Sequence, residues 1–140
     1  MAEYTYSVLQ TVTTNGNVLF TETPISAGNC IVHRDGSGLV TLRGMTNQCR
    51  ARYRVSFCGN IAVPDGGTAG AISVALSVNG EPLTSSTAIV TPTATAAFFN
   101  VSLDAYVDVP RGCCTNVSVK NTSTQDISVQ NANLIVTREA

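Results

Sequence analysis

Residues 50 to 58 read Arg-Ala-Arg-Tyr-Arg-Val-Ser-Phe-Cys, in which polar and apolar side chains alternate strictly. Successive side chains of a β-strand point to opposite faces, so this alternation predicts a strand with one apolar face and one arginine-bearing face. The same period of two recurs along the chain, whereas no long stretch places apolar residues at helical spacing. We therefore predict an all-β protein.

The length of the chain sets the number of domains. A chain of 140 residues is long enough to bury one hydrophobic core, and no linker or internal repeat divides it, so we predict a single domain over residues 1–140. Charged residues make up only 12% of the chain, and the net charge is −1. Such a balance offers no overall field to attract nucleic acid or anionic lipid, so neither nucleic acid nor a membrane is expected as a partner.

The N-terminal residues Met-Ala-Glu-Tyr-Thr-Tyr lack the basic and apolar segments of a secretion signal, so we expect folding in a cytosol, where thiols stay reduced. An odd number of cysteines, five, also argues against a closed disulfide framework. The adjacent Cys113 and Cys114 suggest a redox switch or a soft-metal clamp. Because neighbouring residues of a strand point to opposite faces, we predict instead that both are small buried apolar side chains.

Turn-forming residues separate short β-rich runs and predict about ten strands. The predicted strands are 4–12, 17–22, 30–33, 39–43, 50–58, 71–78, 83–90, 97–109, 114–120 and 127–138. Asn79-Gly80 is a strong hairpin signal, and the strands on either side of it are expected to pair antiparallel.

The two longest predicted strands in the second half of the chain, 97–109 and 127–138, have distinct patterns. The run at 97–109 is expected to be the longest strand and to lie at the centre of a sheet. Its alternation predicts that Phe99, Val101, Leu103, Ala105, Val107 and Val109 point inward and that Asn100, Ser102, Asp104, Tyr106 and Asp108 point outward. In the run at 127–138 the apolar parity changes near Asn131, which predicts a β-bulge or a change of packing partner.

About ten short strands, in a chain without Trp, favour a two-sheet jelly roll over an immunoglobulin sandwich. Three segments resemble the tumour-necrosis-factor/C1q-like (TNF/C1q-like) jelly roll, in the form found in bacteriophage virion proteins and in spore-coat collagen-like tips. They are Arg52-Tyr-Arg-Val-Ser-Phe, Ile72-Ser-Val-Ala-Leu-Ser-Val-Asn-Gly-Glu-Pro-Leu and Ile127-Ser-Val-Gln-Asn-Ala-Asn-Leu-Ile-Val. No collagen-like Gly-X-Y repeat precedes them, which favours the virion form. The resemblance implies a homotrimer.

In the jelly roll that the chain resembles, strands 50–58, 97–109 and 127–138 are neighbours in one sheet, whose outward face packs around a three-fold axis. The resemblance therefore places three arginines beside two aspartates, and we expect charge-assisted hydrogen bonds within or between protomers. The residues expected at this subunit interface are Arg50, Arg52, Arg54, Asp104, Asp108 and Tyr106. The alternative is a solvated ladder of exposed charges that contributes little energy.

Catalytic chemistry is not indicated. His33 is the only histidine, and the sequence singles out no nucleophile to accompany it. Cys30 and His33 have the spacing of a metal-ligand pair, but no second pair matches it. We predict no catalytic residues, no cofactor and no metal, and a protein that is not an enzyme.

Two functions from different classes remain. The first is a structural protein of a bacteriophage virion: a small homotrimer that decorates or cements the capsid, or forms part of a head fibre. It would be made in the bacterial cytoplasm and displayed on the virion surface, and its partner would be the major capsid protein or another virion protein. The second is a receptor- or glycan-binding tip that uses loops 36–38, 65–70 or 91–96. The lack of Trp argues against a site that stacks a sugar on a ring.

Overall fold

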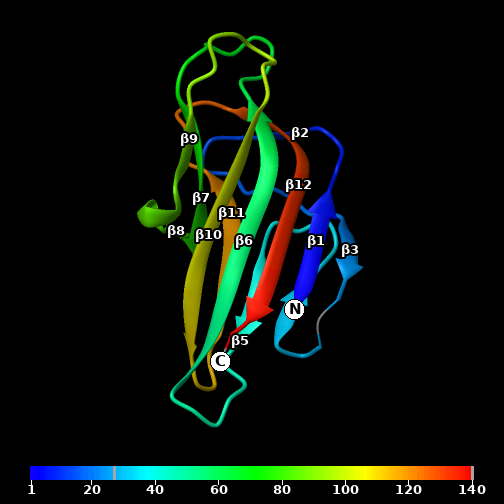
Figure 1. Ribbon diagram of the computed structural model, residues 1–140, viewed down its shortest axis with the longest axis vertical. Helices are drawn as coiled ribbons and strands as arrows, with labels where there is room; N and C mark the ends of the chain where they lie inside the picture. Colours follow the sequence, from blue (N-terminus) through cyan, green and yellow to red (C-terminus); the bar gives the residue numbers. More distant parts are fainter. Residues whose placement is uncertain (27, 140) are drawn as a thin grey trace.

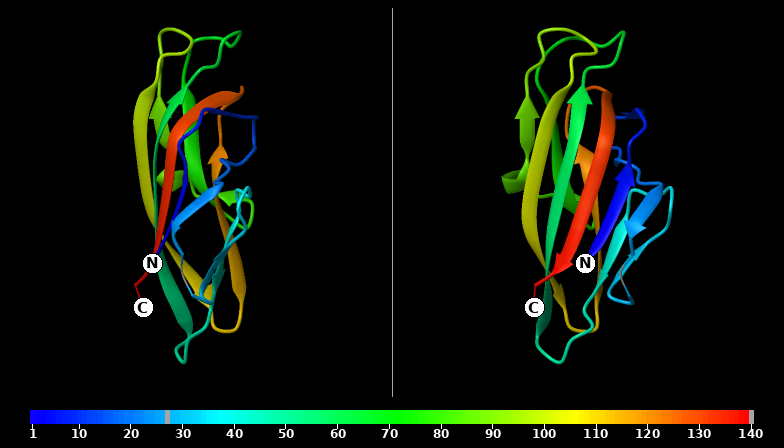
Figure 2. Two further views of the ribbon diagram at one scale, coloured as in Figure 1. Left: turned by 90° about the vertical axis from the view of Figure 1, so that its right-hand side faces the viewer. Right: turned by 45° about the vertical axis from the view of Figure 1, so that its right-hand side comes forward.

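The computed structural model describes residues 1–26 and 28–139 and shows two antiparallel six-stranded sheets packed face to face (Figures 1 and 2). In sheet A the order is β10 (Phe99–Pro110), β6 (Arg50–Ala62), β12 (Ile127–Arg138), β1 (Ala2–Tyr6) and β3 (Glu22–Ile25), and β2 (Gln10–Val12) pairs with the first residues of β12. In sheet B the order is β4 (Ile31–His33), β5 (Val40–Arg43), β11 (Cys114–Asn121), β7 (Ile72–Val78) and β8 (Glu81–Pro82), and β9 (Ala88–Val90) also pairs with β7. The predicted all-β sandwich of two antiparallel sheets is confirmed.

The hydrophobic core lies between the sheets, and β6 supplies a long row of it. Ala51, Tyr53, Val55 and Phe57 are at most 1% exposed, as the alternation predicted. The Tyr53 hydroxyl keeps a hydrogen-bond partner inside the sandwich, because it donates to the main-chain oxygen of Arg43 at 2.7 Å. Each large apolar side chain buried in this way stabilises the fold by about 1.5–3 kcal/mol.

The predicted bulge near Asn131 in β12 is confirmed. The register with β6 shifts between Gln130 and Asn133, and Asn131 has a positive φ of 57°. The shift also explains why the predicted strand 4–12 is divided: β1 pairs with residues 132–136 of β12, and β2 pairs with residues 127–129.

The predicted strand 17–22 is wrong. Only isolated bridges form there, at Asn17 and Phe20, and the next strand, β3, begins at Glu22. The Gln10 side chain occupies both main-chain groups of Leu19: its Nε2 donates to the Leu19 oxygen, and its Oε1 accepts from the Leu19 N–H, both at 3.0 Å. A side chain therefore satisfies backbone groups that would otherwise pair with a strand.

The hairpin at Asn79-Gly80 is confirmed. Both residues have positive φ, 51° and 88°, and β7 pairs antiparallel with β8 and β9. The predicted strand 83–90 is only partly present, because it begins with the 3₁₀ turn η1 (Thr84–Ser86). The Ser86 hydroxyl closes this turn: it donates to the Leu83 oxygen at 2.7 Å and accepts from the Leu76 N–H.

Strand β10 differs from its prediction in two respects. It is an edge strand of sheet A, and β6, with 13 residues, is longer than β10, with 12. Phe99 is 44% exposed although its parity is inward, because it is the first residue of the strand, and the buried row begins at Val101. An alternating pattern identifies a two-sided strand but not its neighbours, so the central position could not be inferred from it.

The prediction that Cys113 and Cys114 are buried is also wrong, since both are exposed. They follow the tight turn after β10, where Gly112 has a φ of 76°, and therefore lie at the end of the sandwich rather than between the sheets. Among the described residues, no helix is long and apolar enough to cross a membrane.

Candidate interaction surface

The outward face of sheet A is a continuous polar surface over its three longest strands, β10, β6 and β12. Their order confirms that the three strands expected to be neighbours are neighbours. In the β10–β6 register, Asp108 lies opposite Arg52 and Tyr106 lies opposite Arg54. All four side chains point away from the core because the residues between them on each strand are turned inward.

The arginines and aspartates pair within one chain. Arg52 forms a bidentate pair with the Asp108 carboxylate: Nε donates to Oδ1 at 2.8 Å and Nη2 donates to Oδ2 at 3.1 Å. Arg54 reaches diagonally to Asp104, where its Nε donates to Oδ2 at 2.9 Å. Arg50 lies 3.5 Å from Asp108. The predicted contacts between these residues therefore form inside the protomer.

These contacts stabilise the ionised carboxylates. The hydrogen bond from Arg54 lowers the pKa of Asp104 below its ordinary value, and a hydrogen bond from the Ser56 hydroxyl adds to the effect. The hydrogen bond from Arg52 lowers the pKa of Asp108 in the same way. The paired side chains are 39% to 50% exposed, so water screens both pairs. A free chain gains little stability from them.

Apolar side chains lie among these charges. Tyr106 is 62% exposed and stands on β10 between Asp104 and Asp108. Ile135 of β12 is 37% exposed and is opposite Ser56 of β6 on the same face. Exposed tyrosine beside arginine is a composition that protein interfaces favour.

The other half of this face carries amides instead of charges, and sequence reasoning missed it. Asn100 donates to Asn60 at 3.2 Å, and Asn60 donates to Asn131 at 3.1 Å, so a row of three amides crosses β10, β6 and β12. Two of these residues occupy outward positions on adjacent strands, and the third lies in the bulge. Once strand order was known, the outward parity of Asn60 and Asn100 could have revealed the row.

The remaining candidate residues do not form one site. Loops 65–70 and 91–96 share an end of the sandwich, where the Ala96 N–H donates to the Val63 oxygen at 2.8 Å, but loop 36–38 packs against Phe20 elsewhere. The His33 side chain is fully buried, and its Nε2 lies 2.8 Å from the Ser37 oxygen. Within the described part of the chain, no three His, Cys, Asp or Glu side chains form a group suited to a metal ion.

Comparison with known proteins supports the fold. No family model matches the sequence, and no curated protein is significantly similar to it. Among solved structures, the globular domain of zebrafish complement 1qA protein is 12% identical with a TM-score of 0.59, over 96% of this chain and 94% of that chain. The structure of murine APRIL at pH 5.0 is 10% identical with a TM-score of 0.63, over 96% and 97%. At these identities the likeness shows the fold alone, and the predicted TNF/C1q-like jelly roll is confirmed.

Proposed function

We propose that this jelly roll is a non-enzymatic domain that forms a homotrimer through the outward face of sheet A. We further propose that the trimer is a structural protein of a bacteriophage virion, assembled in the bacterial cytoplasm, which decorates or cements the capsid or forms part of a head fibre. The observation that carries the self-association is the exposed Tyr106, which lies between two arginine–aspartate pairs on the outward face of sheet A.

Two features support the trimer. Homotrimers are what the TNF/C1q-like jelly roll implies, and the two similar structures match nearly the whole chain. The arginines are also held in place before any association, because Arg52 and Arg54 are already bonded to aspartates. A surface whose long side chains are ordered in advance loses less conformational entropy when it binds a second copy.

A receptor- or glycan-binding tip is the second candidate, and one observation favours it. Phe98 and Phe99 are 40% and 44% exposed and follow loop 91–96 after one intervening residue, Ala97. Aromatic rings at a loop-bearing end can stack on a sugar or contact a protein, a role that the lack of Trp had argued against.

The first experiment is the solution mass of the purified chain by light scattering at high salt, for the natural sequence and for Tyr106→Arg. The matched control is Ile89→Arg, because Ile89 is 67% exposed on β9 of the other sheet. We expect a trimer for the natural chain and the control, and a lower mass for Tyr106→Arg. A monomeric natural chain would contradict the trimer. A Tyr106→Arg variant that is still a trimer would show that the interface does not include the outward face around Tyr106.

The virion role requires a second measurement, co-sedimentation of the trimer with phage capsids that lack this protein. A trimer that sediments with capsids supports the structural role. A trimer that stays in solution, but binds host-cell surface glycans in a way that Phe98→Ala weakens, supports the tip.

A further inference from the structure

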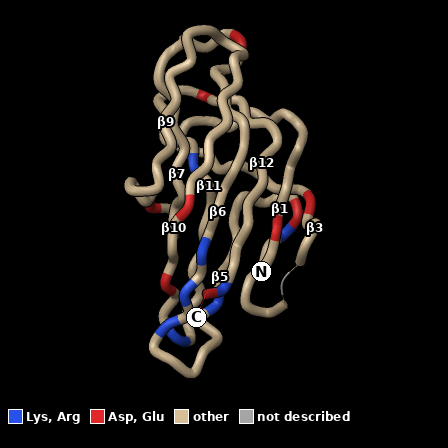
Figure 3. Tube along the Cα trace, viewed as in Figure 1, with Lys and Arg blue, Asp and Glu red and all other residues tan. Residues whose placement is uncertain are grey.

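The two ends of the sandwich carry opposite charge, although the whole chain is almost neutral. One end, here called the basic end, is formed by loops 44–49 and 111–113 and the strand ends beside them. Five of the eight basic residues belong to this end, against two carboxylates of the described residues. Figure 3 shows the blue segments gathered there. The five are Arg43, Arg50, Arg52, Arg111 and Arg138, and the two carboxylates are Asp108 and Glu139.

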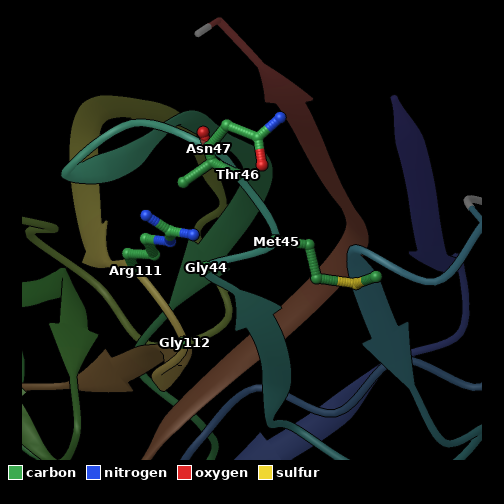
Figure 4. A pocket seen from close by; sticks show the side chains of 6 residues that line it. All are labelled: Gly44, Met45, Thr46, Asn47, Arg111 and Gly112. Carbon is green, nitrogen blue, oxygen red and sulfur yellow. The ribbon is translucent and has the colours of Figure 1, made fainter.

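Two of these arginines have free guanidinium groups. Arg43 and Arg111 have no side-chain hydrogen bond or ion pair with any described residue, whereas Arg52 is held by Asp108. Arg111 lines a shallow depression of about 510 Å³ and lies beside Thr46 and Asn47 in Figure 4. Met45, at the rim, is 49% exposed. An open depression with a free guanidinium suits a carboxylate, which can accept two parallel hydrogen bonds.

The opposite end, here called the acidic end, is formed by loops 63–71 and 122–126 (Figures 1 and 3). Asp65 and Asp126 line a depression there, also of about 510 Å³, and no Lys or Arg lines it. Neither carboxylate has a partner among the described residues. Gln125 ties the two loops together, since its Nε2 donates to the Thr68 oxygen at 2.7 Å and its Oε1 accepts from the Thr68 N–H at 3.1 Å. These hydrogen bonds hold the two loops of the acidic end together in the single chain, before a partner binds.

We propose that the basic end of one molecule binds the acidic end of another copy of this chain, with Arg111 donating to Asp126 or Asp65. Each end has free groups of one sign, so the charges of the two surfaces complement each other. Because the two ends differ, the contact is head to tail. Because they lie at opposite ends of the long axis of the sandwich, its repetition builds an open fibre along that axis rather than a ring.

The strength of this contact follows from its exposure. Ion pairs between exposed side chains are weak and are screened by salt, so one pair of chains associates only slightly. In the proposed trimer each end presents three copies of the contact, which raises the overall affinity without any new interaction. The affinity of the head-to-tail contact therefore rests on the proposed trimer. Which end binds which follows from the charges of a single chain.

Sedimentation velocity over a range of protein concentrations at about 0.01 M and about 1 M salt tests the proposal, because the screening length falls from about 30 Å to about 3 Å. At low salt we expect species larger than the high-salt mass, growing with concentration and disappearing at high salt. Arg111→Glu replaces the free guanidinium of the basic end with a carboxylate, and Asp126→Lys replaces a carboxylate of the acidic end with an ammonium group. Each variant thereby loses the proposed contact between opposite charges, so neither should stack alone. An equal mixture of the two should restore the larger species.

The matched control is Arg34→Glu, which reverses the same charge on an exposed residue away from both ends and should keep the larger species. The proposal is overturned if no larger species forms at low salt, if Arg111→Glu leaves them intact, or if Arg34→Glu removes them equally. The mass at high salt reports the trimer separately. A trimer that does not stack contradicts only the present inference.

Discussion

The inner and outer faces of β6 and β10 come from one alternating pattern, yet they act in different ways. On the inner face, Tyr53, Val55 and Phe57 are at most 1% exposed and lie in one closely packed core. On the outer face, Arg54 and Asp104 are 50% and 43% exposed and pair in contact with water. Packing at the inner face determines whether the chain folds, whereas the outer face adds little to folding and is available for association.

The largest expected effect is on the inner face. Phe57→Ala removes a buried ring that meets Phe20 edge-on, with centroids 6.4 Å apart, and should lower the free energy of unfolding by about 3–5 kcal/mol. Ser56→Ala is the matched control, because Ser56 is the preceding residue and faces outward. Urea unfolding of both variants measures the contrast, and similar losses for the two would refute it.

The bulge in β12 should give the next effect. Asn131 has a φ of 57°, a left-handed conformation that asparagine adopts more readily than alanine because its short polar side chain can form local hydrogen bonds. Asn131→Ala loses that advantage and should cost about 1–2 kcal/mol. Asn131→Gly removes the same acceptor for Asn60 but tolerates that backbone, and should cost less. If thermal unfolding shows equal losses, the amide contact matters and the backbone conformation does not.

A smaller effect is expected for the ion pairs. Asp104→Asn weakens the contacts with Arg54 and Ser56, and should lower the free energy of unfolding of the dissociated chain by less than about 1 kcal/mol. Asp65→Asn serves as the comparison, because Asp65 has no partner among the described residues and its loss should leave stability unchanged. A loss of several kcal/mol for Asp104→Asn in urea unfolding would show that this face also holds the fold together.

The smallest effect is a dependence on pH. The pKa values of Asp104 and Asp108 are lowered from 3.8, so folding favours their ionised forms. Their contribution is fully present above the unfolded pKa and is lost as the pH falls through the lowered folded pKa. Urea unfolding at successive pH values below about 5 should show this small loss. A double variant, Asp104→Asn with Asp108→Asn, should show less of it, and parallel curves would assign the loss to other groups.

Local patterns predicted much of the fold. The alternation at β6, the Asn79-Gly80 hairpin and the parity change at Asn131 are each produced by residues close together in sequence, and all three are confirmed. Errors arose where a distant group decides the outcome. The Gln10 side chain replaces strand pairing at Leu19, and the order of the strands places β10 at an edge. The side-by-side placement of the arginines and aspartates came from the resemblance and is confirmed, whereas the amide row required the strand register.

By itself, the sequence determined which residues face the core and which face water, because a strand's side chains alternate whatever its neighbours are. Only the tertiary structure decided where the charges gather. A net charge of −1 indicated no field, yet Arg43 and Arg111, far apart in sequence, meet at one end, and Asp65 and Asp126 line the other. Electrostatic interactions depend on distances in space, and for residues so far apart in the chain the fold sets those distances.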